Sequence, residues 1–194
     1  MKKKNSVNVL VEVSARHIHL SEKDKEKLFG RDYQLQVMRR LSQPSEFACQ
    51  ETLTIQVNNK KIERVRVVGP FREKTQVEIS QTDAVFLGIE PPLRLSGDLK
   101  GSLPVTLIGP KGVVHLKEGL ILAQRHLHCA PQEALKLGIR DRQSVAVEIK
   151  GSRALIFYNV KVRAKEGYSL AVHLDTDEGN AAGIKKKGRG LILL

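Results

Sequence analysis

The sequence predicts a mainly β protein made of two small domains. Short apolar segments recur along the 194 residues and are separated by turns rich in Gly, Pro and Asn, a spacing typical of small barrels or sandwiches. A related seven-residue phrase also occurs twice, at Ser14–Leu20 and, 109 positions later, at Ala123–Cys129. A chain of this length suits one large domain or two small ones, and the internal repeat favours two.

Turn residues bound the individual elements. Ser21 with Asp24 three positions later resembles a capping box and predicts a helix that ends before Gly30. Pro131 predicts a second helix that ends before Gly138. Further short helices are expected over 82–87 and 177–182. Strands are expected over 9–13, 52–57, 63–68, 76–79, 105–108, 120–123, 144–149, 155–162 and 169–174.

The repeat carries a His-x-His pair in each copy, and each copy follows a strand-like run and precedes a helix. Because residues i and i+2 of an extended segment point to the same side, each copy presents two imidazoles together. Imidazole is the commonest metal ligand and suits zinc, copper, iron or nickel. One isolated pair would more often be a half-exposed surface pair, but four of the six histidines lie in these repeats. The duplication therefore predicts one dinuclear metal site assembled from two related halves.

The amino-acid composition limits the classes of molecule that the protein is expected to bind. The net charge of +12 calls for an anion, which could be nucleic acid, a membrane surface or a phosphorylated small molecule. Three Tyr, five Phe and no Trp give few stacking platforms for nucleic acid, so a phosphorylated cofactor fits at least as well. The basic run at 185–189 is interpreted as a solvated surface turn.

Location is predicted from what the sequence contains. No apolar stretch approaches the roughly 20 residues of a bilayer span. Lys2, Lys3 and Lys4 resemble the start of a signal peptide, but the following run is interrupted by Asn8 and Glu12. Two cysteines are too few for a secreted disulfide framework, so a reducing cytoplasm is expected, with no membrane association.

Six segments in order resemble the phosphate propanoyltransferase family, the PduL-type phosphotransacylases. These segments are SARHIHLS (14–21), LSQPSEFACQET (41–52), RVVGPFREKTQVEISQTDA (66–84), SGDLKGS (96–102), LKEGLILAQRHLH (116–128) and HLDTDEGNAAG (173–183). The resemblance implies a zinc-dependent enzyme that reversibly converts short-chain acyl-CoA and phosphate into acyl phosphate and CoA. It leaves the length of the acyl group, the formation of homo-oligomers and association with a bacterial microcompartment open. Relatives inside microcompartments often carry an N-terminal extension, whereas here few residues precede the first strand, so a free cytoplasmic enzyme or one recruited by another route is expected.

The resemblance also implies the architecture and the ligands. It predicts two small β-barrels capped by short helices, one formed by 6–15 with 124–194 and the other by 16–123, with the active site at their interface. Two zinc ions and CoA would bind there. The implied metal ligands are His17, His19, Glu78, His126, His128 and His173. The sixth histidine, His115, matches no ligand position and is interpreted as structural.

The remaining site residues are also carried over from the family. Arg72 would bind the attacking phosphate, because a guanidinium fork matches a phosphate. Positions near CoA would be Ser14, Ala15, Arg16, Asn59, Arg66 and Asn180. The chain departs from the family at Ala15, where Asn is usual, so a backbone contact is expected there. It departs again at Cys129 and Ala130, where Met-Ser is usual, and Cys129 is interpreted as a packed thiol rather than a nucleophile or ligand.

Two other functions use the same residues. A dinuclear zinc hydrolase of esters or phosphoesters would use water as acceptor and need no phosphate. A basic nucleic-acid-binding barrel with structural zinc would show steep salt dependence and no turnover. The family resemblance weighs against both, and no nucleic-acid partner is expected.

Overall fold

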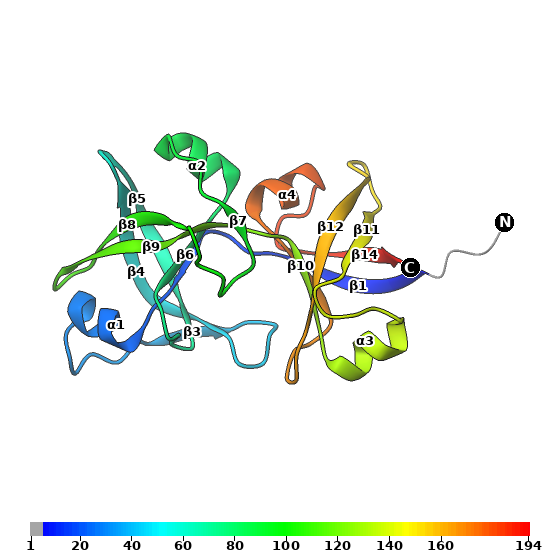
Figure 1. Cartoon of the computed structure of the whole chain (residues 1–194), viewed down its shortest axis with the longest axis horizontal. Coiled ribbons are helices and arrows are strands. Elements are labelled where there is room, and N and C mark those ends of the chain that lie inside the picture. The colour runs from blue at the N-terminus through cyan, green and yellow to red at the C-terminus, as the bar shows by residue number, and fades with distance from the viewer. Residues whose placement is uncertain (1–5) are drawn as a thin grey trace. The chain divides into compact units, whose positions relative to one another are not determined.

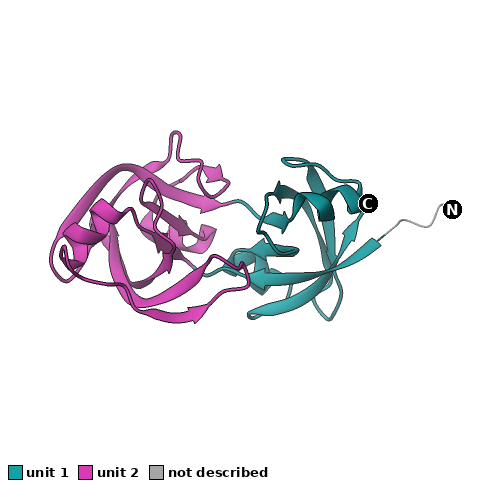
Figure 2. Ribbon diagram, turned by 90° about the horizontal axis from the view of Figure 1, so that it is seen from below, with its two compact units in different colours: residues 1–15, 124–194 teal, residues 16–123 magenta. Residues whose placement is uncertain are grey.

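The computed structural model describes residues 6–194, so the basic residues at positions 2–4 lie outside the described part of the chain. The chain divides into two compact units, residues 1–15 with 124–194 and residues 16–123 (Figure 2). Within residues 6–194 each unit contains a closed six-stranded β-barrel with short helices. The prediction of a mainly β protein with two barrels is therefore confirmed.

The unit formed by 1–15 and 124–194 closes in the strand order β1-β13-β10-β12-β11-β14. Its core contains the inward side chains of these strands, among them Val11, Leu127 and Ile192, each with 0% exposure. Its helices are α3 (Pro131–Leu137) and α4 (Thr176–Ala181) (Figure 1). Its strands are β1 (Ser6–Val13), β10 (His126–Cys129), β11 (Ser144–Ile149), β12 (Leu155–Ala164), β13 (Ala171–Leu174) and β14 (Lys187–Leu193).

The unit formed by 16–123 closes by the pairings β4-β5-β2-β6-β9-β8 and back to β4, with β3 and β7 attached at its margins. Its separate core includes Ile18, Ile55 and Leu107. Its helices are α1 (Glu22–Phe29) and α2 (Gln81–Leu87). Its strands are β2 (His17–His19), β3 (Val37–Arg40), β4 (Phe47–Val57), β5 (Lys60–Gly69), β6 (Gln76–Ile79), β7 (Leu93–Arg94), β8 (Leu103–Ile108) and β9 (Val113–Ala123).

The two barrels share one topology. Each His-x-His strand, β2 or β10, pairs in parallel with one long strand and antiparallel with a short one. The short strand, β6 or β13, then pairs in parallel with the strand that leads into a His-x-His copy, β9 or β1. The internal repeat in the sequence is therefore a repeat of whole barrels.

Helix starts follow the predicted capping. The Ser21 hydroxyl accepts a hydrogen bond from the Asp24 backbone at 3.2 Å, and α1 ends before Gly30. Helix α3 begins at Pro131 and ends before Gly138, which adopts a left-handed φ of 66°. Both predictions are confirmed, and α2 and α4 each begin one residue before the predicted start.

The interpretation of 185–189 as a surface turn is wrong for its second half. Lys187 already belongs to β14, which pairs with both β1 and β11. Gly190 and Ile192 face the core while the basic side chains alternate outward, and Lys187 Nζ lies 2.8 Å from the Glu12 carboxylate. The sequence did not indicate a strand here because several basic residues lie together, which makes the alternation of inward and outward side chains hard to recognise. Strands β3 and β7 were likewise not predicted.

No helix among residues 6–194 combines the length and apolarity that a membrane span requires.

Candidate active site

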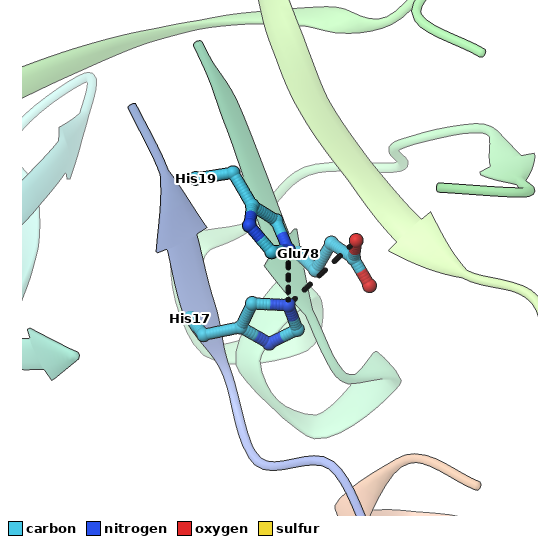
Figure 3. A group of neighbouring side chains, drawn as sticks. All are labelled: His17, His19 and Glu78. Atoms are coloured by element: carbon cyan, nitrogen blue, oxygen red, sulfur yellow. Dashed lines mark hydrogen bonds and ion pairs between the residues drawn. The ribbon is translucent and has the colours of Figure 1, made fainter. Parts of the chain in front are cut away.

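His17, His19 and Glu78 form one cluster in the unit of residues 16–123 (Figure 3). His17 and Glu78 are direct cross-strand partners on β2 and β6, and His19 lies two positions along β2. The Nε2 atoms of the two histidines are 3.1 Å apart, and His17 Nε2 lies 3.7 Å from Glu78 Oε1. One donor atom from each residue lies within 4.8 Å of the others. Two imidazoles and a carboxylate at this spacing are a donor set that suits zinc.

Burial and hydrogen bonding prepare this cluster chemically. His19 Nδ1 donates to the Val68 carbonyl oxygen at 3.0 Å, which leaves the Nε2 lone pair directed at the cluster. Burial, followed by the neighbouring His17 and Arg72 side chains, holds the pKa of His19 well below its usual value, which favours the neutral ring. Burial alone would raise the pKa of Glu78, but His17, His19, the Ser96 hydroxyl and Arg72 outweigh it and lower the pKa to about 2.

A polar network joins this cluster to Arg72. The Arg72 guanidinium lies 2.9 Å from His19 Nε2 through one nitrogen and donates to Ser96 Oγ at 2.7 Å through another. The Gln76 amide donates to Glu78 Oε1 at 2.5 Å and to Ser96 Oγ at 3.0 Å, and its oxygen accepts from the Gly97 backbone. The predicted phosphate ligand and the predicted metal ligands therefore share hydrogen-bonded neighbours.

The Arg72 main chain is fixed as well. Its N–H donates to the Leu20 carbonyl oxygen at 2.8 Å, which ties the segment after β5 to the residue after the His-x-His pair. At the end of β5, Gly69 packs so closely on the Phe47 ring that an added Cβ would overlap that ring. A larger residue at position 69 would require the Phe47 ring to move.

His126, His128 and His173 form the second cluster, in the unit of 1–15 and 124–194. His126 and His173 are direct cross-strand partners on β10 and β13, as His17 and Glu78 are in the other barrel. The three ring centroids lie 4.5–5.2 Å apart, and the His126 and His173 rings are nearly parallel, at 9°. His126 Nδ1 donates to the Gln124 carbonyl oxygen at 2.8 Å, so its Nε2 carries the lone pair.

The predicted CoA contacts are divided between the units. Ser14, Ala15 and Asn180 belong to one, and Arg16, Asn59 and Arg66 belong to the other. The Ser14 N–H donates to the Leu174 carbonyl oxygen, while Ala15 and Asn180 are exposed. These contacts stay predictions.

Arg66 and Asn59 lie in different places on the 16–123 barrel. Arg66 is the β5 partner of His17, and its guanidinium donates to the carbonyl oxygens of Cys49 and Gln50. Asn59 lies in the exposed turn between β4 and β5. At about 3.3 Å per strand residue, that turn is about 20 Å along β5 from Arg66. The fold brings Arg66, but not Asn59, beside the first cluster.

Both cysteines are buried in barrel cores, which confirms that Cys129 is a packed thiol. Burial, followed by nearby acidic groups, raises the pKa of each thiol to about 11. Neither thiolate is available near neutral pH. His115, the remaining histidine, lies 2.9 Å from Thr106 Oγ1 across the β8–β9 pair.

Comparison of this sequence with known proteins identifies the family to which the chain belongs. The family model described as phosphate propanoyltransferase matches residues 10–185. The chain belongs to the phosphate propanoyltransferase family. A phosphate propanoyltransferase from Thermotoga maritima is 47% identical over 175 residues, which cover 90% of this chain and 83% of the relative. One from Priestia megaterium is 46% identical over 191 residues, covering 98% and 88%.

Membership of the phosphate propanoyltransferase family identifies the chain as an acyltransferase of the phosphotransacylase type. The family implies acyl-CoA and phosphate as its substrates. The family resemblance indicated both candidate ligand clusters and Arg72, but not Gln76 or Tyr168. The Tyr168 ring centroid lies 4.1 Å from that of His128. The i, i+2 relation of Gln76 to Glu78 on one strand was a signal that could have indicated Gln76.

Proposed function

We propose that the chain is a zinc-dependent phosphotransacylase that interconverts a short-chain acyl-CoA plus phosphate with an acyl phosphate plus CoA. The supporting observation is the His17, His19 and Glu78 cluster with the Arg72 guanidinium beside it. One zinc would be held by these three ligands and a second by His126, His128 and His173, since zinc binds both imidazole nitrogen and carboxylate oxygen. Bound zinc would supply a Lewis acid that polarises the thioester carbonyl and neutralises developing negative charge.

The protein's own groups would bind and orient the anion. Arg72 presents a planar fork of donors, and Ser96 holds one side of that fork. Fixing the phosphate against the thioester lowers the entropic barrier of a bimolecular reaction. A phosphate oxygen forms the new bond to the acyl carbon, the carbon–sulfur bond breaks, and the electron pair leaves with the CoA thiolate.

Direct attack by phosphate needs no acyl-enzyme. The two thiols of the chain are buried and have pKa values of about 11, so an acyl-cysteine intermediate is disfavoured. Glu78, with its lowered pKa, remains a carboxylate and suits a metal ligand rather than a proton donor. A cytoplasmic location, homo-oligomers and microcompartment association stay predictions.

Release of free thiol from an acyl-CoA tests the proposal. Purified protein is incubated with acetyl-CoA or propanoyl-CoA, with and without phosphate, and thiol and acyl phosphate are both measured. Phosphotransacylation predicts that the two products appear in equal amounts and only with phosphate. Thiol release without phosphate would indicate a hydrolase, and release that survives complete removal of zinc would exclude the metal requirement.

A further inference from the structure

An arginine immediately before each His-x-His pair reaches a helix of the same barrel. Arg16 contacts Asp83 twice, through Nε to Oδ2 at 2.8 Å and through a terminal nitrogen to Oδ1 at 2.7 Å. In the other barrel a terminal nitrogen of Arg125 lies 2.6 Å from Glu178 Oε1. The carboxylates are largely buried, with side-chain exposures of 6% and 17%. The two ion pairs therefore occupy equivalent places in the two barrels.

The same carboxylates also cap their helices. Asp83 Oδ2 accepts the Ser80 N–H at 3.2 Å at the start of α2, and Glu178 Oε2 accepts the Asp175 N–H at 3.0 Å at the start of α4. Helix α2 starts directly after the strand that carries Glu78, and α4 starts directly after the strand that carries His173. Each carboxylate is thus hydrogen-bonded at the end of the strand, β6 or β13, that carries the third residue of its cluster.

In each barrel these contacts form a ring, meaning a closed path of covalent links and hydrogen bonds that starts and ends at the first histidine of the cluster. In the 16–123 barrel, the ring runs from His17 through its neighbour Arg16 to Asp83, through the cap to β6, and across the β2–β6 pairing back to His17. In the other barrel it runs from His126 through Arg125 and Glu178 to β13 and back across the pairing of His126 with His173. The ring joins the two strands that supply the ligands.

The helices that follow the His-x-His strands provide an internal comparison. Asp24 and Glu133 occupy the same third position in α1 and α3, and Glu133 accepts the Ala130 N–H at 2.8 Å. Asp24 accepts a hydrogen bond from Thr75 instead. Among the ion pairs of residues 6–194, neither carboxylate pairs with an arginine. Helix capping alone therefore does not account for the arginine contacts of Asp83 and Glu178.

We propose that Asp83 and Glu178 are positioning residues, each of which fixes the His-x-His pair of its barrel against the third ligand through the preceding arginine. The inference rests on the proposed function, in that the two clusters bind metal ions. An ionised, hydrogen-bonded carboxylate holds an arginine in a defined geometry, and groups that orient ligands commonly change metal affinity 10- to 100-fold. Arg16 and Arg125 thereby act on the ligands without touching the reacting atoms.

Zinc titration of three isosteric variants tests this role. Asp83→Asn and Glu178→Gln remove the charge but keep an oxygen for the helix cap, and Glu133→Gln makes the same change at a cap without an arginine. Chelator-stripped full-length proteins are titrated with zinc against a chromophoric competitor, and their thermal unfolding is followed by circular dichroism. We expect one of two zinc sites to weaken about 10- to 100-fold in each of the first two variants and less than about 2-fold in the control.

The conservative variant Asp83→Glu separates charge from packing, and it should bind zinc more tightly than Asp83→Asn. Equal zinc affinities in Asp83→Asn, Glu178→Gln and Glu133→Gln, with normal zinc binding by the unchanged protein, would overturn the positioning role alone. Failure of the unchanged protein to bind zinc would overturn the metal assignment, and the positioning role with it. If either test variant does not fold, the same comparison is made with Arg16→Gln or Arg125→Gln, which removes the same ion pair from its other side.

Discussion

The two barrels have the same strand pairings but a different third residue in the cluster that each one carries. His17 pairs across the sheet with Glu78, whereas His126 pairs across the equivalent position with His173. A divalent ion held by three neutral imidazoles would keep its whole charge, while Glu78 would cancel one unit of it. The 16–123 barrel restores positive charge with Arg72, which lies 2.9 Å from His19. A repeated backbone thus carries two electrostatically different sites.

The side chains around the two clusters differ as well, because those around Glu78 are polar and the one beside His128 is aromatic. Around Glu78, the Gln76 amide and the Ser96 hydroxyl form a hydrogen-bond network that extends to Arg72. Around His128, the neighbour is the Tyr168 ring, and Arg163 lies 5.8 Å from the centre of that ring. The cluster of His17, His19 and Glu78 therefore has an arginine within its hydrogen-bond network, whereas the cluster of His126, His128 and His173 has an aromatic ring beside it.

Removing one histidine from each barrel gives the largest expected effect. His17→Ala or His126→Ala should each lower the transfer rate at least about 100-fold, and the double variant should lose little more, because residues that act as a unit are non-additive. Steady-state rates with zinc content and circular dichroism provide the measurement. His115→Ala is the control, with a rate near that of the unchanged protein. Partial losses that multiply in the double variant would mean two independent sites.

Arg72→Ala should give the next largest effect, and it should be specific to the 16–123 barrel. Loss of a charge-assisted phosphate contact is expected to cost about 2 to 4 kcal/mol, or about 30- to 1000-fold in kcat/KM for phosphate. The KM for acyl-CoA should change far less. Arg39→Ala, on exposed β3, is the matched control. Unaltered phosphate kinetics in Arg72→Ala would remove Arg72 from the phosphate site.

Gln76→Ala sharpens the comparison between the two clusters. Without its amide, the Glu78 carboxylate loses a 2.5 Å donor, and one of two zinc ions should bind about 10-fold more weakly. The second zinc should bind as before, because Gln76 belongs to the other barrel. Competition titration measures both constants. Equal weakening of both sites, or of neither, would contradict the independence of the two ligand shells.

Cys129→Ala should have the smallest effect on activity. Cys129 and Leu20 occupy equivalent positions after the two His-x-His pairs, and both are buried core residues. The transfer rate should stay within about 2-fold, while the free energy of unfolding should fall by about 1 kcal/mol. Kinetics and chemical denaturation test the two statements. A large loss of rate in stably folded Cys129→Ala would reopen a catalytic role for the thiol.

The sequence alone determined the features that depend on neighbours in the chain. The spacing of His-x-His in an extended segment, the capping residues Ser21 and Pro131, and the duplication of a whole phrase are local signals. They predicted a mainly β protein, the helices and the two His-x-His pairs, whereas Glu78, His173 and the two-barrel architecture were implied by the family resemblance. Strands β3, β7 and β14 were not predicted from the sequence because short or charged strands lack a clear alternation of apolar and polar residues.

Only the tertiary structure decided which distant residues meet. Gln76 and Ser96 lie 20 positions apart and become partners because β6 and the segment after β7 converge near Glu78. Arg16 finds Asp83 across 67 positions because β2 and β6 pair side by side. Propensity and periodicity describe one segment at a time, whereas register and hydrogen bonding between segments arise when the barrel closes. The sequence therefore named the candidate ligands, and the closed barrels brought distant polar groups beside them.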